Sequence, residues 1–187
     1  IGRARGYHGS GFGGTSVGGI VANRNQYPNL LNGVIHLPHT HIPSKNSFSK
    51  GQPKYGSEKA DALEDIISFH GEGNIAAVII EPVAGSTGVL VPPIGYLEKI
   101  RKICTENNIL LIFDEVITGF GRLGDAFAAN RFKVYPDIIT MAKGITNATV
   151  PMGAVGVTTE IYNTLYKTHK TGIELFHGYT YSGHPLA

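Results

Sequence analysis

Short runs of apolar residues alternate along the chain with longer stretches in which apolar residues recur at helical spacing. The runs at 75–82, 109–115 and 137–142 are almost continuously apolar, which is typical of strands buried on both faces. Between and before them, the stretches 57–71 and 94–108 place apolar residues three or four positions apart, which predicts amphipathic helices. This alternation indicates an α/β fold with a mostly parallel sheet and helices on both faces.

The same patterns predict further elements and the faces that they bury. Strands are expected at 33–37 and 152–158 and a helix at 160–168, and Ser57 is a candidate N-cap. The connection between the last two strands is so short that this pair is expected to be antiparallel. The inward-facing residues of the two main helices are predicted to be Ala62, Leu63, Ile66, Ile67 and Phe69 in the first, and Tyr96, Leu97, Ile100, Ile103 and Cys104 in the second.

Composition narrows the function classes. The 187 residues are 42% hydrophobic and 16% charged, as in ordinary globular proteins, and the net charge of +2 does not favour binding to nucleic acid or to an anionic membrane. No apolar run approaches the roughly 18 residues of a membrane span, and no secretory signal is visible. Cys104 is the single cysteine, so the chain forms no internal disulfide, which suits a reducing, cytoplasmic compartment.

Three predicted strands carry an ionisable residue where they end: Glu81, Asp114 and Lys143. Each one alone could be a solvated strand terminus, but parallel strands bind ligands beyond their carboxyl ends, and three such residues favour a shared polar crevice. A lysine there can lose its proton and attack a carbonyl to form a Schiff base. An aspartate nearby could hold a cation, such as the protonated ring nitrogen of pyridoxal phosphate.

At these residues the sequence resembles the class III, pyridoxal-phosphate-dependent aminotransferases, and most closely their ω-amino acid–pyruvate (β-alanine–pyruvate) branch. The resemblance runs nearly from end to end, in the blocks 5–20, 36–43, 81–97, 110–124, 136–147, 150–155 and 177–185. It implies the large cofactor-binding domain of the fold-type I, aspartate aminotransferase-like enzymes. It also implies transfer of an amino group from an ω-amino acid or amine to pyruvate.

The resemblance further implies roles for seven residues. Lys143 would be the Schiff-base lysine and would then shuttle the proton, and Asp114 would hold the protonated pyridine nitrogen. Tyr7 would stack on one face of the ring and Val116 would pack on the other, with His8 beside the cofactor but assigned no chemical step. Glu81 would pair with a switching arginine. Thr180 would bind the phosphate in the neighbouring subunit, so a homodimer is expected.

Two parts of the family pattern are expected outside the given chain. A glycine-serine turn that binds the phosphate should lie upstream of Ile1, and an arginine that binds the substrate carboxylate should lie downstream of Ala187 in a small domain. Residues 1–187 therefore resemble the central part of the large domain, and this segment is expected to be inactive by itself. Other reactions of the same cofactor, such as those of a mutase or decarboxylase, and a catalytically silent or non-enzymatic homologue remain alternatives.

Three other motifs suggest chemistry that we do not favour. The sequence "GFGRLG" at 119–124 fits a dinucleotide-binding loop, but five residues separate it from the preceding strand. His36, His39 and His41 could suggest zinc, although a fourth ligand is missing and an ordinary loop is favoured. The glycine-rich stretch 11–19 could cradle a phosphate, but a flexible surface turn is favoured, and the role of Arg122 is left open.

Overall fold

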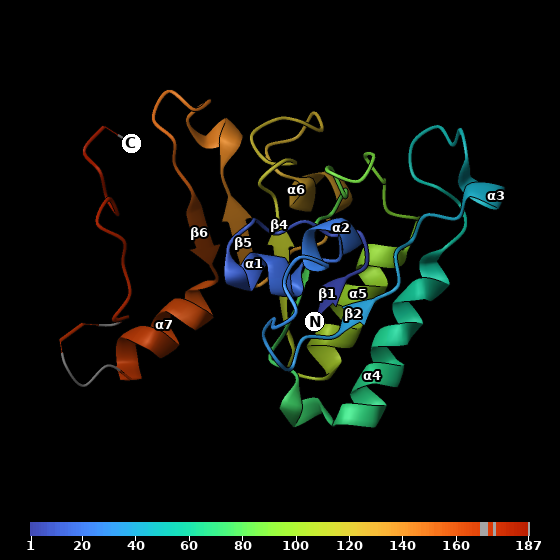
Figure 1. Cartoon of the computed structure of the whole chain (residues 1–187), viewed down its shortest axis with the longest axis horizontal. Coiled ribbons are helices and arrows are strands. Elements are labelled where there is room, and N and C mark those ends of the chain that lie inside the picture. The colour runs from blue at the N-terminus through green and yellow to red at the C-terminus, as the bar shows by residue number, and fades with distance from the viewer. Residues whose placement is uncertain (169–171, 174, 187) are drawn as a thin grey trace.

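The chain forms one main sheet, as seen in a computed structural model that describes residues 1–168, 172–173 and 175–186. The sheet contains β3 (Ala77–Ile80), β4 (Leu110–Asp114), β5 (Ile138–Met141) and β6 (Ala154–Val157) in that order (Figure 1). Strands β3, β4 and β5 are parallel, and β6 runs antiparallel to β5. Both the mostly parallel sheet and the antiparallel last pair confirm the predictions.

Two short strands extend this arrangement at its other edge. Strands β1 (Gly2–Arg3) and β2 (His36–Leu37) pair in parallel. The amino group of Ile1 donates to the carbonyl of Ala77 at 2.7 Å, and the Ile79 amide donates to the carbonyl of Ile1 at 2.9 Å. The N-terminal segment is thereby attached to the edge of β3. The strand predicted over 33–37 is confined to its last two residues.

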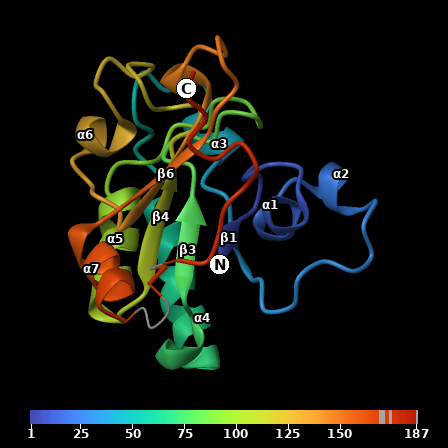
Figure 2. The ribbon, with the colours of Figure 1, turned by 90° about the vertical axis from the view of Figure 1, so that its left-hand side faces the viewer.

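Helices lie on both sides of the sheet, as predicted. Helices α5 (Tyr96–Glu106) and α6 (Ala128–Phe132) lie on one side, and α1 (Phe12–Val17) and α2 (Val21–Arg24) on the other (Figure 2). The remaining helical elements are α3 (Pro43–Asn46), α4 (Ala62–His70), α7 (Thr159–Thr168) and the 3-10 turns Ser57–Asp61, Glu72–Asn74 and Lys143–Ile145. None of the helices in the described ranges is long and apolar enough to cross a membrane.

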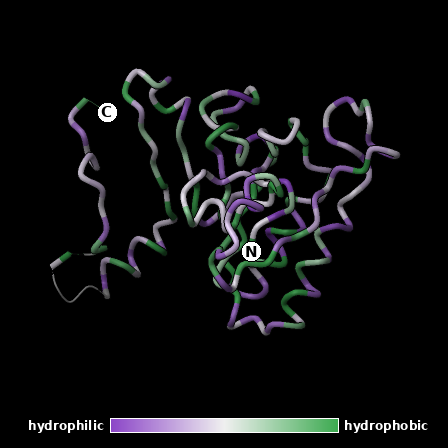
Figure 3. The backbone as a smooth tube through the Cα atoms, viewed as in Figure 1, coloured by the Kyte–Doolittle hydropathy of each residue, from purple (hydrophilic) through white to green (hydrophobic). Residues whose placement is uncertain are grey.

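The core lies between the sheet and helices α4 and α5. All five residues predicted to face inward from α5 are buried, including Cys104, and they pack with buried side chains of β3 and β4 such as Val78 and Phe113. Along α4 the hydropathy alternates between polar and apolar (Figure 3), so this helix covers the core with one face only. Burial of these continuous apolar strands is the main driving force for the fold.

Two predictions about α4 were wrong. Ser57 is not an N-cap, because it begins a 3-10 turn preceded by Gly56 at a φ of 115°, and the α-helix starts at Ala62 without a side-chain cap. Phe69 is 84% exposed, although Leu63 on the same helix is fully buried. Phe69 lies at the border of the apolar stripe and next to the helix end, where its ring packs against His70.

The glycine-rich stretch 11–19 is also different from the prediction. It contains helix α1, in which Thr15 and Ser16 are buried, and is not a flexible turn. The Arg24 guanidinium donates to the carbonyls of Thr15, Ser16 and Gly18, which terminate this helix. The glycines allow close packing, since a Cβ on Gly14 would lie 2.3 Å from the His8 carbonyl oxygen.

The packing of α5 against the sheet predicts which substitutions destabilise the chain. Ile100→Ala should lower the free energy of unfolding by roughly 2–5 kcal/mol, because it opens a cavity at a fully buried position. Phe69→Ala is the matched control and should change it by less than about 0.5 kcal/mol. Chemical denaturation measures both values. Equal losses for the two variants would contradict this assignment of the core.

The burial of Cys104 predicts its reactivity. Desolvation raises the pKa of this thiol from 9.0 to about 11. At pH 8 a thiol reagent should therefore modify the folded chain about a hundredfold more slowly than the denatured chain. The thiol of the unfolded state loses its proton first, so the stability of the fold should decrease as the pH rises from about 9 to 11. Rapid modification of the native chain would show that Cys104 is accessible.

Candidate active site

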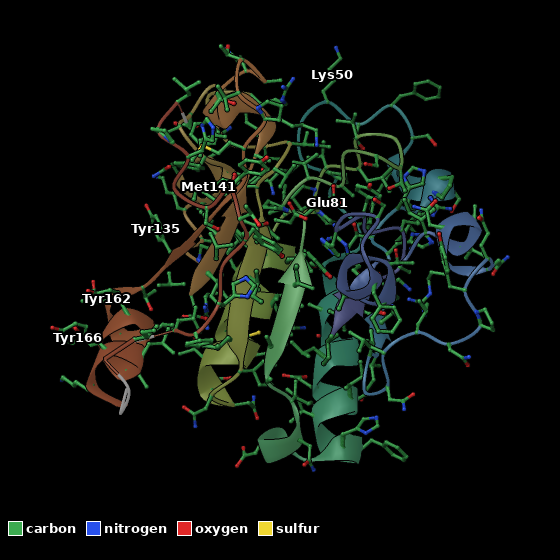
Figure 4. The ribbon with its side chains drawn as sticks, turned by 60° about the vertical axis from the view of Figure 1, so that its left-hand side comes forward. Lys50, Glu81, Tyr135, Met141, Tyr162 and Tyr166 are labelled. Carbon is green, nitrogen blue, oxygen red and sulfur yellow. The ribbon has the colours of Figure 1, made fainter. Side chains whose placement is uncertain are left out.

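The carboxyl ends of the three parallel strands meet at one cavity of about 390 Å³. Glu81 after β3, Asp114 at the end of β4 and Lys143 after β5 all line it, as the sequence predicted. Glu81 lies just beyond the tip of β3 (Figure 4). The other lining residues are Tyr7, His8, Gly9, Ser10, Ile79, Val116, Ile117 and Thr140. Six of the seven residues singled out from the sequence are thus brought together.

Asp114 is held by two contacts inside the cavity wall. Its Oδ2 lies 2.8 Å from Nδ1 of His8, and its Oδ1 accepts a hydrogen bond from the Val116 amide at 3.1 Å. The exposed fractions of the two side chains are only 2% for His8 and 9% for Asp114. An ionised carboxylate can only accept, so Nδ1 of His8 carries the proton and donates it to Asp114. The carboxylate is thereby fixed in orientation while it remains negative.

Two buried polar atoms of residues that line the cavity have no hydrogen-bond partner in the described part of the chain. They are Nε2 of His8 and Oγ1 of Thr140. An unsatisfied buried polar atom costs roughly 1–3 kcal/mol, so each of these two atoms is expected to bond to a ligand or to water. Sequence reasoning missed Thr140. The register could have found it, because Thr140 pairs with Asp114 across β4 and β5 and therefore shares its face.

Lys143 differs from the carboxylates because its amine is unpaired. Within residues 1–168, 172–173 and 175–186, it makes no hydrogen bond or ion pair. Its backbone has a φ of 47°, in the left-handed region, which costs a non-glycine residue roughly 1–3 kcal/mol. Such strain is concentrated at functional sites. An exposed, unpaired amine on a fixed backbone suits a nucleophile.

Glu81 holds together two loops that border the cavity. It is 4% exposed, and its two carboxylate oxygens accept hydrogen bonds from the amides of Tyr7 and Gly85, each at 2.9 Å. The Arg3 side chain donates to the carbonyl of Glu81, not to its carboxylate. In the part of the chain that the structure describes, no arginine pairs with this carboxylate. The pairing with a switching arginine therefore stays a prediction.

Glu115 is a buried carboxylate that the sequence reasoning did not assign. It is fully buried, and it accepts hydrogen bonds from the hydroxyl of Thr118 and from the amides of Ala128 and Ala129. Those two amides open helix α6, so Glu115 caps this helix from thirteen residues upstream. The only sign of this residue in the sequence is that the apolar run ends in two adjacent carboxylates, Asp114 and Glu115. The sequence does not show which of the two faces the cavity.

The remaining sequence motifs lie outside this cavity. Thr180 is exposed in the segment 175–186 and does not line it. Between 119 and 124 the chain forms turns, not the start of a helix, and Nε of Arg122 donates to the carbonyl of Ile117 at 2.8 Å. His36 donates to the Gly18 carbonyl. No cluster of three metal-ligating side chains is found in the described ranges.

Comparison with known proteins identifies the family. A family model described as aminotransferase class-III matches residues 1–187. The chain belongs to the class III aminotransferases. Its sheet and flanking helices accordingly have the architecture of the large domain of fold-type I enzymes.

Curated relatives and solved structures agree with this assignment. The chain is 63% identical to an omega-aminotransferase of Caulobacter vibrioides and 54% identical to an omega-amino acid–pyruvate aminotransferase of Pseudomonas putida, over its full length. It spans only 43% and 42% of the length of these relatives. An omega transaminase of Pseudomonas jessenii, solved in complex with PMP, superimposes with a TM-score of 0.85 at 32% identity, covering 97% of this chain and 40% of that one.

The two hydrogen bonds of Glu81 predict a stability effect in this aminotransferase chain. Glu81→Gln replaces one accepting oxygen by an NH2 group, which cannot accept from a backbone amide. The free energy of unfolding should fall by roughly 1–3 kcal/mol. Glu64→Gln, on the exposed side of α4, is the matched control and should have little effect. Denaturant titration of both variants measures the difference, and an unchanged midpoint for Glu81→Gln would refute the anchoring role.

Proposed function

We propose that the protein is a pyridoxal-phosphate-dependent aminotransferase that moves an amino group from an ω-amino acid, such as β-alanine, or from an amine to pyruvate. The observation that carries this proposal is the meeting of Lys143 and Asp114 at one cavity, with an unpaired amine and a fixed, buried carboxylate. The names of relatives at 54–63% identity support the reaction and its substrates. Because the chain spans less than half of these relatives, the proposal concerns the whole protein.

The residues of the cavity fit this cofactor. When bound, pyridoxal phosphate supplies an aldehyde that accepts amines and a ring that withdraws electrons. Lys143 would hold it covalently through Nζ, and Asp114 would hold its pyridine nitrogen. A cavity of about 390 Å³ is within the range of small-ligand sites, which is roughly 300–1,000 Å³. The unpartnered atoms of His8 and Thr140 offer further polar contacts to the cofactor or to water around it.

Other residues of the cavity would orient the cofactor and transfer the proton. His8 donates to the Asp114 carboxylate and holds it in place, and this carboxylate would favour a protonated nitrogen opposite. Tyr7 and Val116 also line the cavity and would cover the two faces of the ring. Glu81 fixes the backbone of Tyr7 and thereby the place of its side chain. The amine of Lys143, once released by the substrate, would carry the proton between substrate and cofactor carbon.

The surroundings of this site extend beyond one copy of the chain. We expect residues 1–187 to be the central part of the large domain, with the phosphate-binding turn and the carboxylate-binding arginine in flanking segments. Thr180 would bind the phosphate of a second copy in a homodimer. The exposed aromatic side chains around it, Phe176, Tyr179 and Tyr181 at 78–87% exposure, support burial against a partner. A cytoplasmic location is expected.

The proposal is tested by replacing Lys143. In the full-length protein, Lys143→Ala should abolish covalent attachment of the cofactor and lower the rate of alanine formation from pyruvate and β-alanine by about 10²–10⁴-fold. Borohydride reduction followed by peptide mass analysis measures attachment, and an alanine assay measures the rate. Asp114→Asn should keep the attachment but weaken cofactor binding, because the neutral amide no longer balances a protonated nitrogen.

Lys50→Ala is the control for these variants. Lys50 projects from an exposed loop away from the cavity (Figure 4), so its loss should leave both attachment and rate unchanged. A cofactor that attaches to another lysine in the Lys143→Ala protein would refute the assignment. Full-length wild-type protein without any trapped cofactor would overturn the proposed function itself.

A further inference from the structure

The motif "GFGRLG" at 119–124 has no role in the proposed chemistry, yet it contacts the lysine-bearing turn. Phe120 lies directly over Gly144, the residue after Lys143. A Cβ placed on Gly144 would lie 2.8 Å from Cβ of Phe120 and 3.3 Å from its ring. Only a glycine allows this approach, so the two loops are in van der Waals contact at the base of the reactive side chain.

Both partners of this contact have unusual backbones. Phe120 has a φ of 59° and Lys143 a φ of 47°, and such values are true outliers for side chains of this size. A strained backbone persists only where its surroundings hold it. Ile145 N–H donates to the Ala142 carbonyl at 3.2 Å, which is a weak constraint on the turn, so the packing of Phe120 against Gly144 is a substantial further one.

Phe120 packs in turn against a second aromatic residue, Phe127. Its ring packs edge-on against Phe127, with centroids 5.2 Å apart, and Phe127 lies at the start of helix α6. Glu115 fixes that helix start through the amides of Ala128 and Ala129. A Cβ placed on Gly119 would lie 3.1 Å from the Phe127 ring, so the glycine allows the backbone to approach this ring closely. A continuous set of contacts thus runs from the buried Glu115 through two aromatic rings to Gly144.

We propose that Phe120 is a positioning residue that braces the turn carrying Lys143, so that the amine reaches the cofactor carbonyl in the right geometry. Phe120 does not line the cavity and acts only through Gly144. The inference rests on the proposed function, because it assigns a geometric requirement to the amine of that site. It gives the glycine-rich motif a structural meaning: Gly119 admits Phe127 and Phe120 covers Gly144.

The test is the rate at which the cofactor becomes covalently attached to Lys143 in the full-length apoprotein. Phe120→Ala should lower this rate about tenfold, since small displacements of a reacting group have large effects on rate. Phe120→Tyr keeps the ring and should stay within about twofold of wild type. Phe69→Ala, at an exposed phenylalanine of α4, is the matched control and should have no effect. Absorbance and borohydride trapping measure attachment, and thermal unfolding is recorded for each variant.

Gly144→Ala tests the same contact from the other side. It keeps both aromatic rings but adds a Cβ where only 2.8 Å is available, so it should slow attachment to a similar degree. The double variant should be little slower than the slower single variant, because both substitutions disturb the same contact between the two loops. If Phe120→Ala does not fold, Gly144→Ala decides. Attachment at the wild-type rate in these variants would overturn the brace, whereas a wild type without attachment would overturn the proposed function.

Discussion

The parallel register of β3, β4 and β5 is the constraint on which the site depends. It pairs Ile80 with Phe113, and Asp114 with Thr140, so the ends of the three strands are level. The residues that follow each strand must therefore lie at one edge of the sheet, whatever their chemistry. The apolar interior of the strands supplies most of the stability, and the strand register brings the polar residues at their ends to this edge.

At this edge of the sheet the carboxylates have hydrogen-bond donors, whereas the amine of Lys143 has no partner in the described residues. Glu81, Asp114 and Glu115 are all buried, and each is held mainly by backbone amides, a hydroxyl or the His8 ring. None of them forms an ion pair with a lysine or arginine side chain in the described residues. Neutral donors stabilise a carboxylate without neutralising its field. As a result, within the described residues, Lys143 has no hydrogen-bond or ion-pair partner and no lysine or arginine occupies the Asp114 carboxylate.

Short-range patterns predicted the strands, the two long helices and three of the cavity residues, Glu81, Asp114 and Lys143. The other three, Tyr7, His8 and Val116, were implied by the family resemblance and not by a local pattern. Continuous apolar runs indicate buried strands, and an ionisable residue at the end of each run marks the edge of the sheet. The predictions that were wrong or missing depend on contacts between residues far apart in the sequence. The exposure of Phe69 depends on where α4 overhangs the core, and helix α1 forms because Arg24 and the glycines allow it to pack closely. Thr140 and Glu115 needed the strand register and the position of α6, which no local pattern contains.

The turn at Lys143 combines a strained, left-handed backbone with a long, flexible side chain. Attack on a carbonyl and transfer of a proton require the amine to move over a short path but to start from a fixed point. An ordinary helical or extended backbone at 143 would aim the side chain elsewhere, so the left-handed φ of 47° is retained despite its cost. Residues 147 and 148 also have left-handed φ values, of 51° and 59°, so the chain after β5 reverses through several strained positions. Such a reversal is stable only if neighbouring elements pack against it, and the 116–127 loop, fixed at its end by Glu115, does so at Gly144. The stability of that loop is therefore expected to affect the reactivity proposed for the amine, although no residue of "GFGRLG" lines the cavity.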